Sequence, residues 1–289
     1  MPTSFSVERR ATYSEYRTRE LVVAGDGPTI VLVHGFAHAA ETWIPLLDLL
    51  HRAGRAAVAV DLPGFGKADP LLPGSLVPQL DRFLGEVIRR YAGSNGVVLV
   101  GNSLGAAMAL RAGRAVDLPV NAVVALDTAG ITWRRLVSIG LDPIVSANQL
   151  YAAIGCPERV HRSLATRAAQ SLLYGRKSAV VPEVVAQLAA VASDPAETHR
   201  LLRLGARFKA ELDRTTDHGD VRVPLVAVHG ARDRLVPVSA SRILYDANPG
   251  SRLVVLPHAG HCPQLDATSA VSQLVREMAG ISNTSREIS

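Results

Sequence analysis

The stretch Val97-Val98-Leu99-Val100-Gly101-Asn102-Ser103-Leu104-Gly105 decides the interpretation of the whole chain. Its four leading apolar residues are typical of a strand that is buried on both faces of a sheet. The Ala-rich segment Leu104 to Ala115 then indicates a helix. In the Gly-x-Ser-x-Gly pattern between them, the glycines relieve the collisions of a sharp strand-to-helix turn. The pattern predicts an exposed, nucleophilic Ser103 at the tip of the turn; a glycine-rich turn without chemistry is the alternative.

Other segments repeat this alternation of buried strand and helix. The expected strands are Thr29–Val33, Ala56–Val60, Val97–Val100, Val120–Leu126, Pro224–Val228 and Arg252–Leu256. The expected helices are Glu41–Ala53 with Thr42 as a cap, Leu76–Tyr91, Leu104–Ala115, Ser239–Ala247 and Ala267–Met278. Glu15–Ala24 is expected to form an opening strand or hairpin before a turn at Gly25–Pro28. The order predicts an α/β fold with a mostly parallel, twisted sheet and helices on both faces.

The alternation stops between residues 128 and 217, where helical patterns are interrupted by prolines. We interpret residues 128–217 as an inserted helical lid, and residues 1–127 and 218–289 as the two parts of the core. Within this lid, Leu201, Leu204 and Phe208 share one helical face and Arg200, Arg203 and Arg207 share the other. The arginine face is expected to be solvated surface rather than a docking site for an anionic substrate or carrier.

Composition excludes several classes of protein. The 289 residues include only 4% aromatics, which argues against a base-stacking nucleic-acid platform, and the net charge of +5 comes from scattered arginines. Cys156 and Cys262 match neither a disulfide framework nor a metal pattern, and Met1–Arg19 lacks the apolar run of a signal peptide. We expect a cytoplasmic monomer or homodimer that binds a small-molecule substrate, with no nucleic-acid or membrane partner.

Polar residues or special backbone follow four of the expected strands, at Phe36, Ser103, Asp233 and His261. In a parallel sheet, reactive groups gather at the carboxyl ends of the strands. A serine hydroxyl needs an adjacent base, which imidazole can supply, and a carboxylate can then hold that imidazole in the right tautomer. The chain order Ser, Asp, His is the order that the α/β-hydrolase fold requires.

Five segments in this order make the chain resemble the α/β-hydrolase superfamily, in particular its lidded serine esterase and C–C hydrolase branch. They are HGF at 34–36, DLPGFG at 61–66, GNSLG at 101–105, GARDRLVP at 230–237 and GHCP at 260–263. The resemblance spans Thr29 to Met278 and implies an α/β-hydrolase fold with a Ser103, His261 and Asp233 triad and no cofactor or metal. It also implies an oxyanion hole made by the backbone N–H groups of Phe36 and Leu104.

Alternatives exist for the base and the acid. His258 is the rival base, although a loop or surface role suits it better, and Asp127 is the rival acid because some relatives take their acid from that position. Asp61 is expected to tie its loop, while His34 and His229 are expected to make structural hydrogen bonds. Asn102 and Asp266 depart from the common family pattern, and we assign neither a part in the mechanism.

His38, Trp133 and Val236 are the expected pocket residues. The lid offers aliphatic side chains, Trp133, Tyr151 and Tyr174, and no obvious carboxylate clamp, so a small to medium, mainly apolar substrate is expected. The predicted function is ester cleavage by a serine hydrolase. Alternatives are hydrolysis of a C–C bond in vinylogous diketones, a non-hydrolytic perhydrolase, lyase or cyclase reaction, and a hydrolase-like receptor.

Overall fold

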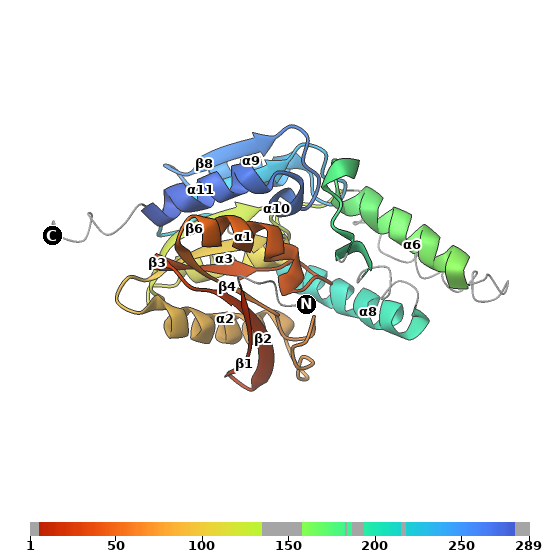
Figure 1. Cartoon of the computed structure of the whole chain (residues 1–289), viewed down its shortest axis with the longest axis horizontal. Coiled ribbons are helices and arrows are strands. Elements are labelled where there is room, and N and C mark those ends of the chain that lie inside the picture. The colour runs from red at the N-terminus through yellow and green to blue at the C-terminus, as the bar shows by residue number, and fades with distance from the viewer. Residues whose placement is uncertain (1–5, 135–157, 183, 187–193, 215–217, 281–289) are drawn as a thin grey trace.

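The strand β5 (Val97–Asn102) lies inside an eight-stranded sheet in the computed structural model, which describes residues 6–134, 158–182, 184–186, 194–214 and 218–280. The strand order is β1-β2-β4-β3-β5-β6-β7-β8 (Figure 1). The other strands are β1 (Val7–Tyr13), β2 (Tyr16–Val23), β3 (Asp26–Val33), β4 (Arg55–Val60), β6 (Val120–Leu126), β7 (Leu225–Gly230) and β8 (Arg252–Leu256). Only the β1–β2 and β2–β4 pairs are antiparallel, which confirms the predicted mostly parallel sheet.

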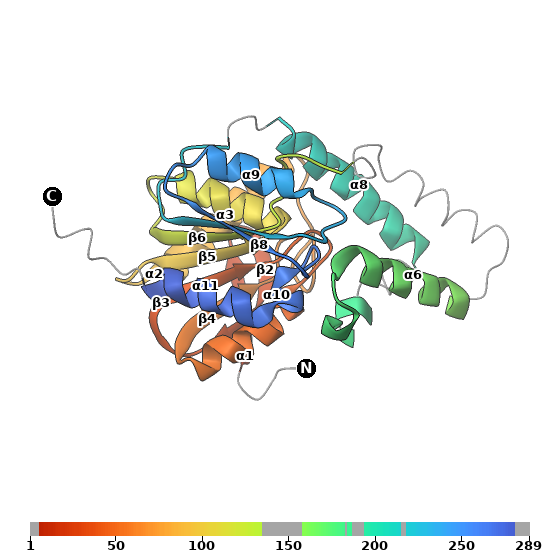
Figure 2. The same ribbon diagram turned by 90° about the horizontal axis from the view of Figure 1, so that it is seen from above.

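Helices cover both faces of the sheet, as Figure 2 shows. Along β3, Ile30 and Leu32 pack in the core that contains α1 (Ile44–Arg52) and α11 (Thr268–Gly280). The intervening Val31 and Val33 pack in the core that contains α2 (Leu76–Ala92), α3 (Leu104–Arg114) and part of α9 (Val238–Asp246). Since both faces are buried, successive residues of a central strand are apolar whichever face they point to, and this explains the continuous apolar runs.

Between β6 and β7 the described residues form helices and no strand. They are α6 (Glu158–Leu173), the 3-10 turn η2 (Lys177–Ala179) and α8 (Pro195–Leu212), and the two long helices project beyond one end of the sheet (Figures 1 and 2). The side chain of Asp194 caps α8 by accepting from the backbone N–H groups of Ala196 and Glu197. The limits 128–217 for a separate lid stay a prediction.

The helix α8 buries its apolar face against the core. Leu201, Leu204 and Phe208 are at most 8% exposed and belong to the same apolar cluster as α2 and α3. The opposite face carries the arginines. The amphipathic pattern therefore fixes which side of α8 faces the body of the protein.

The sequence analysis assigns no strand before Glu15, but the structure has the strand β1 there. β1 lies at the edge of the sheet, its residues are mostly exposed, and it pairs only with β2. An edge strand needs no continuous apolar run, so its pattern resembles that of a loop. The predicted turn at Gly25–Pro28 was also wrong, because β3 begins at Asp26, with a register irregularity before Ile30.

Two helix starts also differ from expectation. Thr42 lies in a 3-10 turn, η1 (Ala40–Trp43), and its hydroxyl donates to the carbonyl of Ala39 at 3.0 Å instead of capping α1. The last helix is preceded by a separate short turn, α10 (Pro263–Asp266). Both differences lie at element ends, where local hydrogen bonds decide the boundary.

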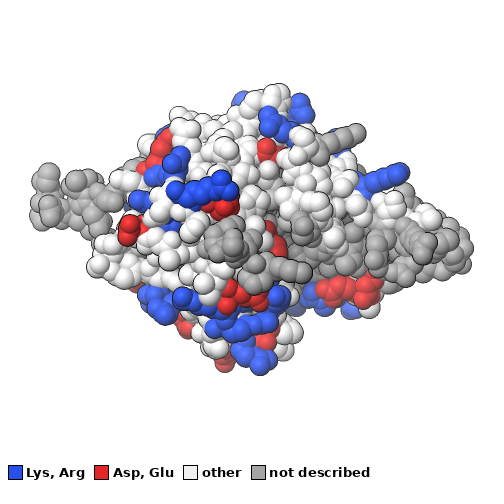
Figure 3. All heavy atoms as spheres, in the orientation of Figure 1, with Lys and Arg blue, Asp and Glu red and all other residues white. Residues whose placement is uncertain are grey.

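Surface charge is mixed on the face that Figure 3 presents, where basic and acidic side chains lie close to one another. Arg89 with Asp117 and Arg252 with Glu277 are exposed pairs of this kind. Among the helices of the described residues, none combines the length and apolar character needed to span a bilayer.

Candidate active site

Ser103 stands between β5 and α3 with backbone angles of φ 54° and ψ −112°. A positive φ is unfavourable for a residue with a Cβ atom and persists only where the surroundings impose it. A Cβ atom on Gly101 would lie 2.3 Å from the carbonyl oxygen of Gly105, and one on Gly105 would lie 2.1 Å from that of Val33. Only glycine permits this crossing, so the motif sets the position of the serine.

His261 and Asp233 meet although they lie on different loops. The imidazole Nδ1 of His261 is 2.7 Å from Oδ2 of Asp233. The other carboxylate oxygen, Oδ1, accepts from the backbone N–H groups of Leu235 at 2.7 Å and Val236 at 3.0 Å. Because the carboxylate accepts at His261 Nδ1, this nitrogen carries the proton and Nε2 is left as the basic nitrogen.

Asp233 is ionised in this environment. Burial by itself would raise the pKa of Asp233, but the charge and hydrogen bond of the His261 ring, followed by the hydrogen bond from the backbone of Leu235, lower it to about 2. The side chain is therefore a fixed negative charge that can stabilise an imidazolium.

Asp127, the rival acid, lies beside this pair in a different state. It follows β6 with a φ of 46°, is fully buried, and accepts from the N–H of Gly230 through Oδ1 at 3.0 Å. Its Oδ2 has no hydrogen-bond partner in the described residues. Burial and the neighbouring Asp233 charge raise the pKa of Asp127 well above its usual value. Of the two carboxyls, Asp127 is therefore the one that holds its proton more tightly.

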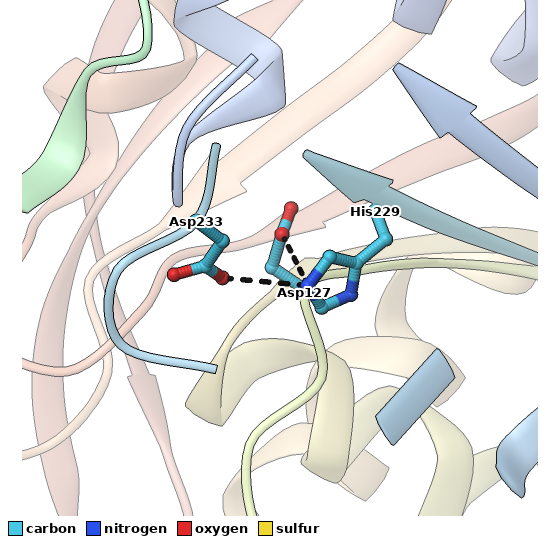
Figure 4. A group of neighbouring side chains, drawn as sticks. All are labelled: Asp127, His229 and Asp233. Atoms are coloured by element: carbon cyan, nitrogen blue, oxygen red, sulfur yellow. Dashed lines mark ion pairs between the residues drawn. The ribbon is translucent and has the colours of Figure 1, made fainter. Parts of the chain in front are cut away.

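His229 completes a buried group with the two aspartates (Figure 4). Its Nε2 is 3.4 Å from Oδ1 of Asp127, 3.7 Å from Oδ2 of Asp233, and 3.2 Å from the carbonyl oxygen of Val236. Because a carbonyl can only accept, Nε2 carries the proton, while Nδ1 lies 2.8 Å from the hydroxyl of Ser241. Burial lowers the pKa of His229, which keeps the ring neutral. With Nε2 donating, this group is a hydrogen-bond network and lacks a free imidazole ligand for a metal.

A cavity of about 640 Å³ brings the predicted residues together. Ser103, His261, Phe36 and Leu104 line it, and so do the three expected pocket residues His38, Trp133 and Val236. Such a volume suits a small to medium organic ligand. Most of the remaining wall is aliphatic and comes from α8.

His38 places a neutral imidazole in this wall. The ring is 4% exposed, and its Nδ1 has no hydrogen-bond partner in the described residues. Burial, followed by the neighbouring His34 and His261, lowers the pKa of His38 to about 3. An unpaired buried nitrogen costs free energy, so His38 is suited to meet a polar atom of a ligand.

Phe36 and Leu104, whose backbone N–H groups are expected to bind an oxyanion, line the same cavity as Ser103. Leu104 is the first residue of α3, so its N–H has no acceptor within its own helix. Gly35 precedes Phe36, and a Cβ atom there would lie 3.3 Å from Cβ of Ser103. The ring of Phe36 packs edge-on against Phe65 at 5.2 Å and Phe208 at 6.3 Å, which holds this loop against α8.

His34 and Asp61 hold the loops beneath the cavity. His34 Nδ1 is 2.7 Å from the Gly35 carbonyl, and its Nε2 accepts from Leu62 N–H at 2.9 Å. Asp61 accepts from the backbone N–H groups of Ala40 at 2.7 Å and Lys67 at 2.8 Å. Each side chain therefore acts through the backbone of its loop.

Asn102 and Asp266 matter more than the sequence interpretation assumed. The side-chain amide of Asn102 donates to the carbonyl of His261 at 2.9 Å, which ties the serine turn directly to the histidine loop. Asp266 accepts from Gly260 N–H at 2.7 Å and from Gly175 N–H at 2.8 Å. Both residues lie next to motif residues, but only the fold brings their partners close.

Several other residues that the sequence analysis considered do not line the cavity. His258 is exposed, and its Nδ1 accepts from Arg232 at 3.1 Å. Tyr174 was expected to face the substrate, but it packs in a separate cluster with Val184 and Val185. Its hydroxyl accepts from Val181 N–H at 3.3 Å. Cys262 is a buried free thiol, whereas Tyr151 and Cys156 lie outside the described residues.

The model of the alpha/beta hydrolase family matches residues 30–274. The chain belongs to this family. The match covers β3 from Ile30 onward and every strand from β4 to β8, and therefore the serine turn and both loops of the His–Asp pair.

Individual relatives are hydrolases. The chain is 26% identical over 264 residues to a pimeloyl-[acyl-carrier protein] methyl ester esterase of Vibrio atlanticus, covering 88% of this chain and 95% of that one. It is 27% identical over 262 residues to a putative carbamate hydrolase, RutD, of Escherichia coli, covering 89% and 93%. A serine hydrolase involved in carbazole degradation shares the fold, with a TM-score of 0.74 at 23% identity over 96% of this chain and 99% of that one. These relatives support a hydrolase activity.

Proposed function

We propose that this alpha/beta hydrolase cleaves carboxylic esters by transferring the acyl group to Ser103 and then to water. The observation that carries the proposal is the 2.7 Å contact between His261 and Asp233 beside the cavity that Ser103 lines. The esterase named among its relatives supports an ester as the bond cleaved.

In the proposed reaction, Oγ of Ser103 attacks the ester carbonyl while Nε2 of His261 takes the hydroxyl proton. The charge on Asp233 stabilises the imidazolium that forms. The backbone N–H groups of Leu104 and Phe36 bind the developing oxyanion, where each donor contributes about 3 kcal/mol in comparable sites.

The leaving alcohol receives its proton from His261, and the acyl group stays on Ser103. Water then attacks the acyl-enzyme with His261 as base, and the acid is released. Each proton removed from a nucleophile is returned to a leaving group, so the site regains its starting state.

Pre-steady-state kinetics with p-nitrophenyl esters of graded acyl length tests the proposal. We expect a burst of p-nitrophenol equal to the active sites, followed by turnover, and Ser103→Ala should remove both while circular dichroism shows a folded chain. Turnover retained in Ser103→Ala would contradict the proposal.

The same assay separates the alternatives. A burst without later turnover would favour a hydrolase-like receptor. Cleavage of a vinylogous diketone with no activity on any ester would favour C–C hydrolysis instead.

A further inference from the structure

The helix α8 forms one wall of the cavity and brings cationic side chains to it. Arg203 and Lys209 line the cavity, together with His199 and Asp213. The sequence interpretation placed Arg203 on a solvated arginine face and found no carboxylate clamp. In the structure Arg203 is exposed, as that interpretation expects, and it also lines the space that Ser103 lines.

Most charged groups of α8 already have partners. Arg200 pairs with Glu197 at 2.7 Å, and Arg207 donates to the carbonyl of Gly74 at 2.6 Å. Lys209 forms an ion pair with Asp213, whose other carboxylate oxygen accepts from Trp133 at 2.8 Å. The Lys209 and Asp213 charges therefore cancel within the lining.

Arg203 differs from these residues. The one hydrogen bond that its guanidinium makes within the described residues goes to Nδ1 of His199, at 2.9 Å, and no described carboxylate lies within 4.0 Å of it. Because an arginine can only donate, Nδ1 of His199 accepts, so a neutral His199 ring carries its proton on Nε2. Among the described residues, the lining thus holds one positive charge without an acidic partner, on the exposed side chain of Arg203, and several unused N–H donors.

We propose that Arg203 binds a carboxylate on the substrate, remote from the ester that is cleaved. The preferred substrates are then hemiesters of dicarboxylic acids, whose apolar chain fills the aliphatic cavity while the free acid reaches the guanidinium. A guanidinium matches a carboxylate with two parallel hydrogen bonds, and apolar walls strengthen their attraction. This inference rests on the proposed esterase function and adds a substrate class to it.

The test compares mono-p-nitrophenyl esters of dicarboxylic acids with p-nitrophenyl alkanoates of the same carbon number. We expect the wild-type enzyme to favour the hemiester in kcat/KM at one range of chain lengths, and high salt to reduce that preference. In Arg203→Gln the ratio of hemiester to neutral-ester kcat/KM should fall about tenfold, mainly through KM, as loss of a charge-assisted hydrogen bond implies.

Arg207→Gln is the matched control, because Arg207 lies on the same helix and outside the cavity lining. Its ratio should equal that of the wild type. The proposal is overturned if the wild type favours neutral esters at every length, or if Arg203→Gln and Arg207→Gln lower the ratio equally.

If the chain is not an esterase, the result is different, because neither ester is turned over. Calorimetric titration with dicarboxylates of graded length then decides the anion site by itself. Weaker binding to Arg203→Gln than to Arg207→Gln supports the site, and equal or absent binding to the wild type overturns it.

Discussion

Two buried aspartates lie side by side at the candidate active site, and their pKa values are shifted in opposite directions. Asp233 accepts from His261 and from two backbone N–H groups, whereas Asp127 accepts from one backbone N–H and has an unpartnered oxygen. Two adjacent carboxyls cannot both be charged in a dry site without a large cost, so the better-bonded one keeps the charge. Hydrogen bonding therefore supports the proposal that Asp233 is the acid.

The variant Asp127→Asn tests this assignment through pH. Folding raises the pKa of Asp127, so the folded chain holds a proton that the unfolded chain releases, and rising pH then favours unfolding. Asparagine keeps both hydrogen-bonding functions without ionising. Relative to wild type, the free energy of unfolding of Asp127→Asn should increase above about pH 3.9, by at most about 1.4 kcal/mol per pH unit. Urea unfolding at pH 4 and pH 7 measures the difference.

Asp233→Asn is the matched control in the ester assay. It should lose up to about 10⁴-fold in kcat, the loss that follows when the histidine tautomer is no longer held in serine proteases. Asp127→Asn should retain most turnover. The reverse result, with Asp127→Asn inactive and Asp233→Asn active, would assign the acid to Asp127.

At the scale of elements, the crossing of β5 and α3 over the end of β3 is one of the tightest backbone contacts beside Ser103. Gly105→Ala would push a methyl group into the carbonyl oxygen of Val33, which is 2.1 Å away, and backbone cannot rotate aside as a side chain can. We expect a loss of about 1–3 kcal/mol in the free energy of unfolding, as overpacking usually causes, together with lost ester turnover.

Gly280→Ala provides the comparison, because nothing lies within 4 Å of the added Cβ atom. Its unfolding free energy should stay within about 0.5 kcal/mol of wild type. Denaturant titration followed by circular dichroism measures both variants. If Gly105→Ala unfolds at the wild-type midpoint and hydrolyses esters normally, the steric account of the motif is wrong.

Elements with a strong periodic pattern were predictable, and those without one were not. The strands β3 to β7 are largely buried, and their apolar runs identified them. The run at β8 also identified a strand, but this strand lies at an edge of the sheet and is only partly buried, so the expectation of a buried strand there was wrong. The edge strand β1 carries charged residues and gave no such signal. The hydrogen bond from Asn102 to His261 joins residues 159 positions apart, so no local pattern could reveal it.

The position of Arg203 at the cavity could not be predicted either, because it also depends on contacts between residues that are distant in sequence. Arg200, Arg203 and Arg207 are equivalent on a helical wheel, and only the packed structure distinguishes the one that lines the cavity. The wheel showed correctly which face of α8 is apolar. What lies opposite each charged residue depends on loops that are distant in sequence.

At the scale of the whole molecule, one end of the sheet gathers side chains from across the chain. Ser103 follows β5, Asp127 follows β6, Asp233 follows β7, and His261 follows β8. Parallel strands place these ends along one edge, and α8 closes the space beside them. The fold thereby turns a sequence order into a spatial cluster.

Peptide mapping after reaction with a fluorophosphonate tests the central claim, that this convergence activates Ser103. The account predicts one adduct per chain, located on Ser103, absent in Ser103→Ala and strongly slowed in His261→Ala. An adduct on a different residue, or an ester-hydrolysing protein that forms no adduct on Ser103, would contradict it.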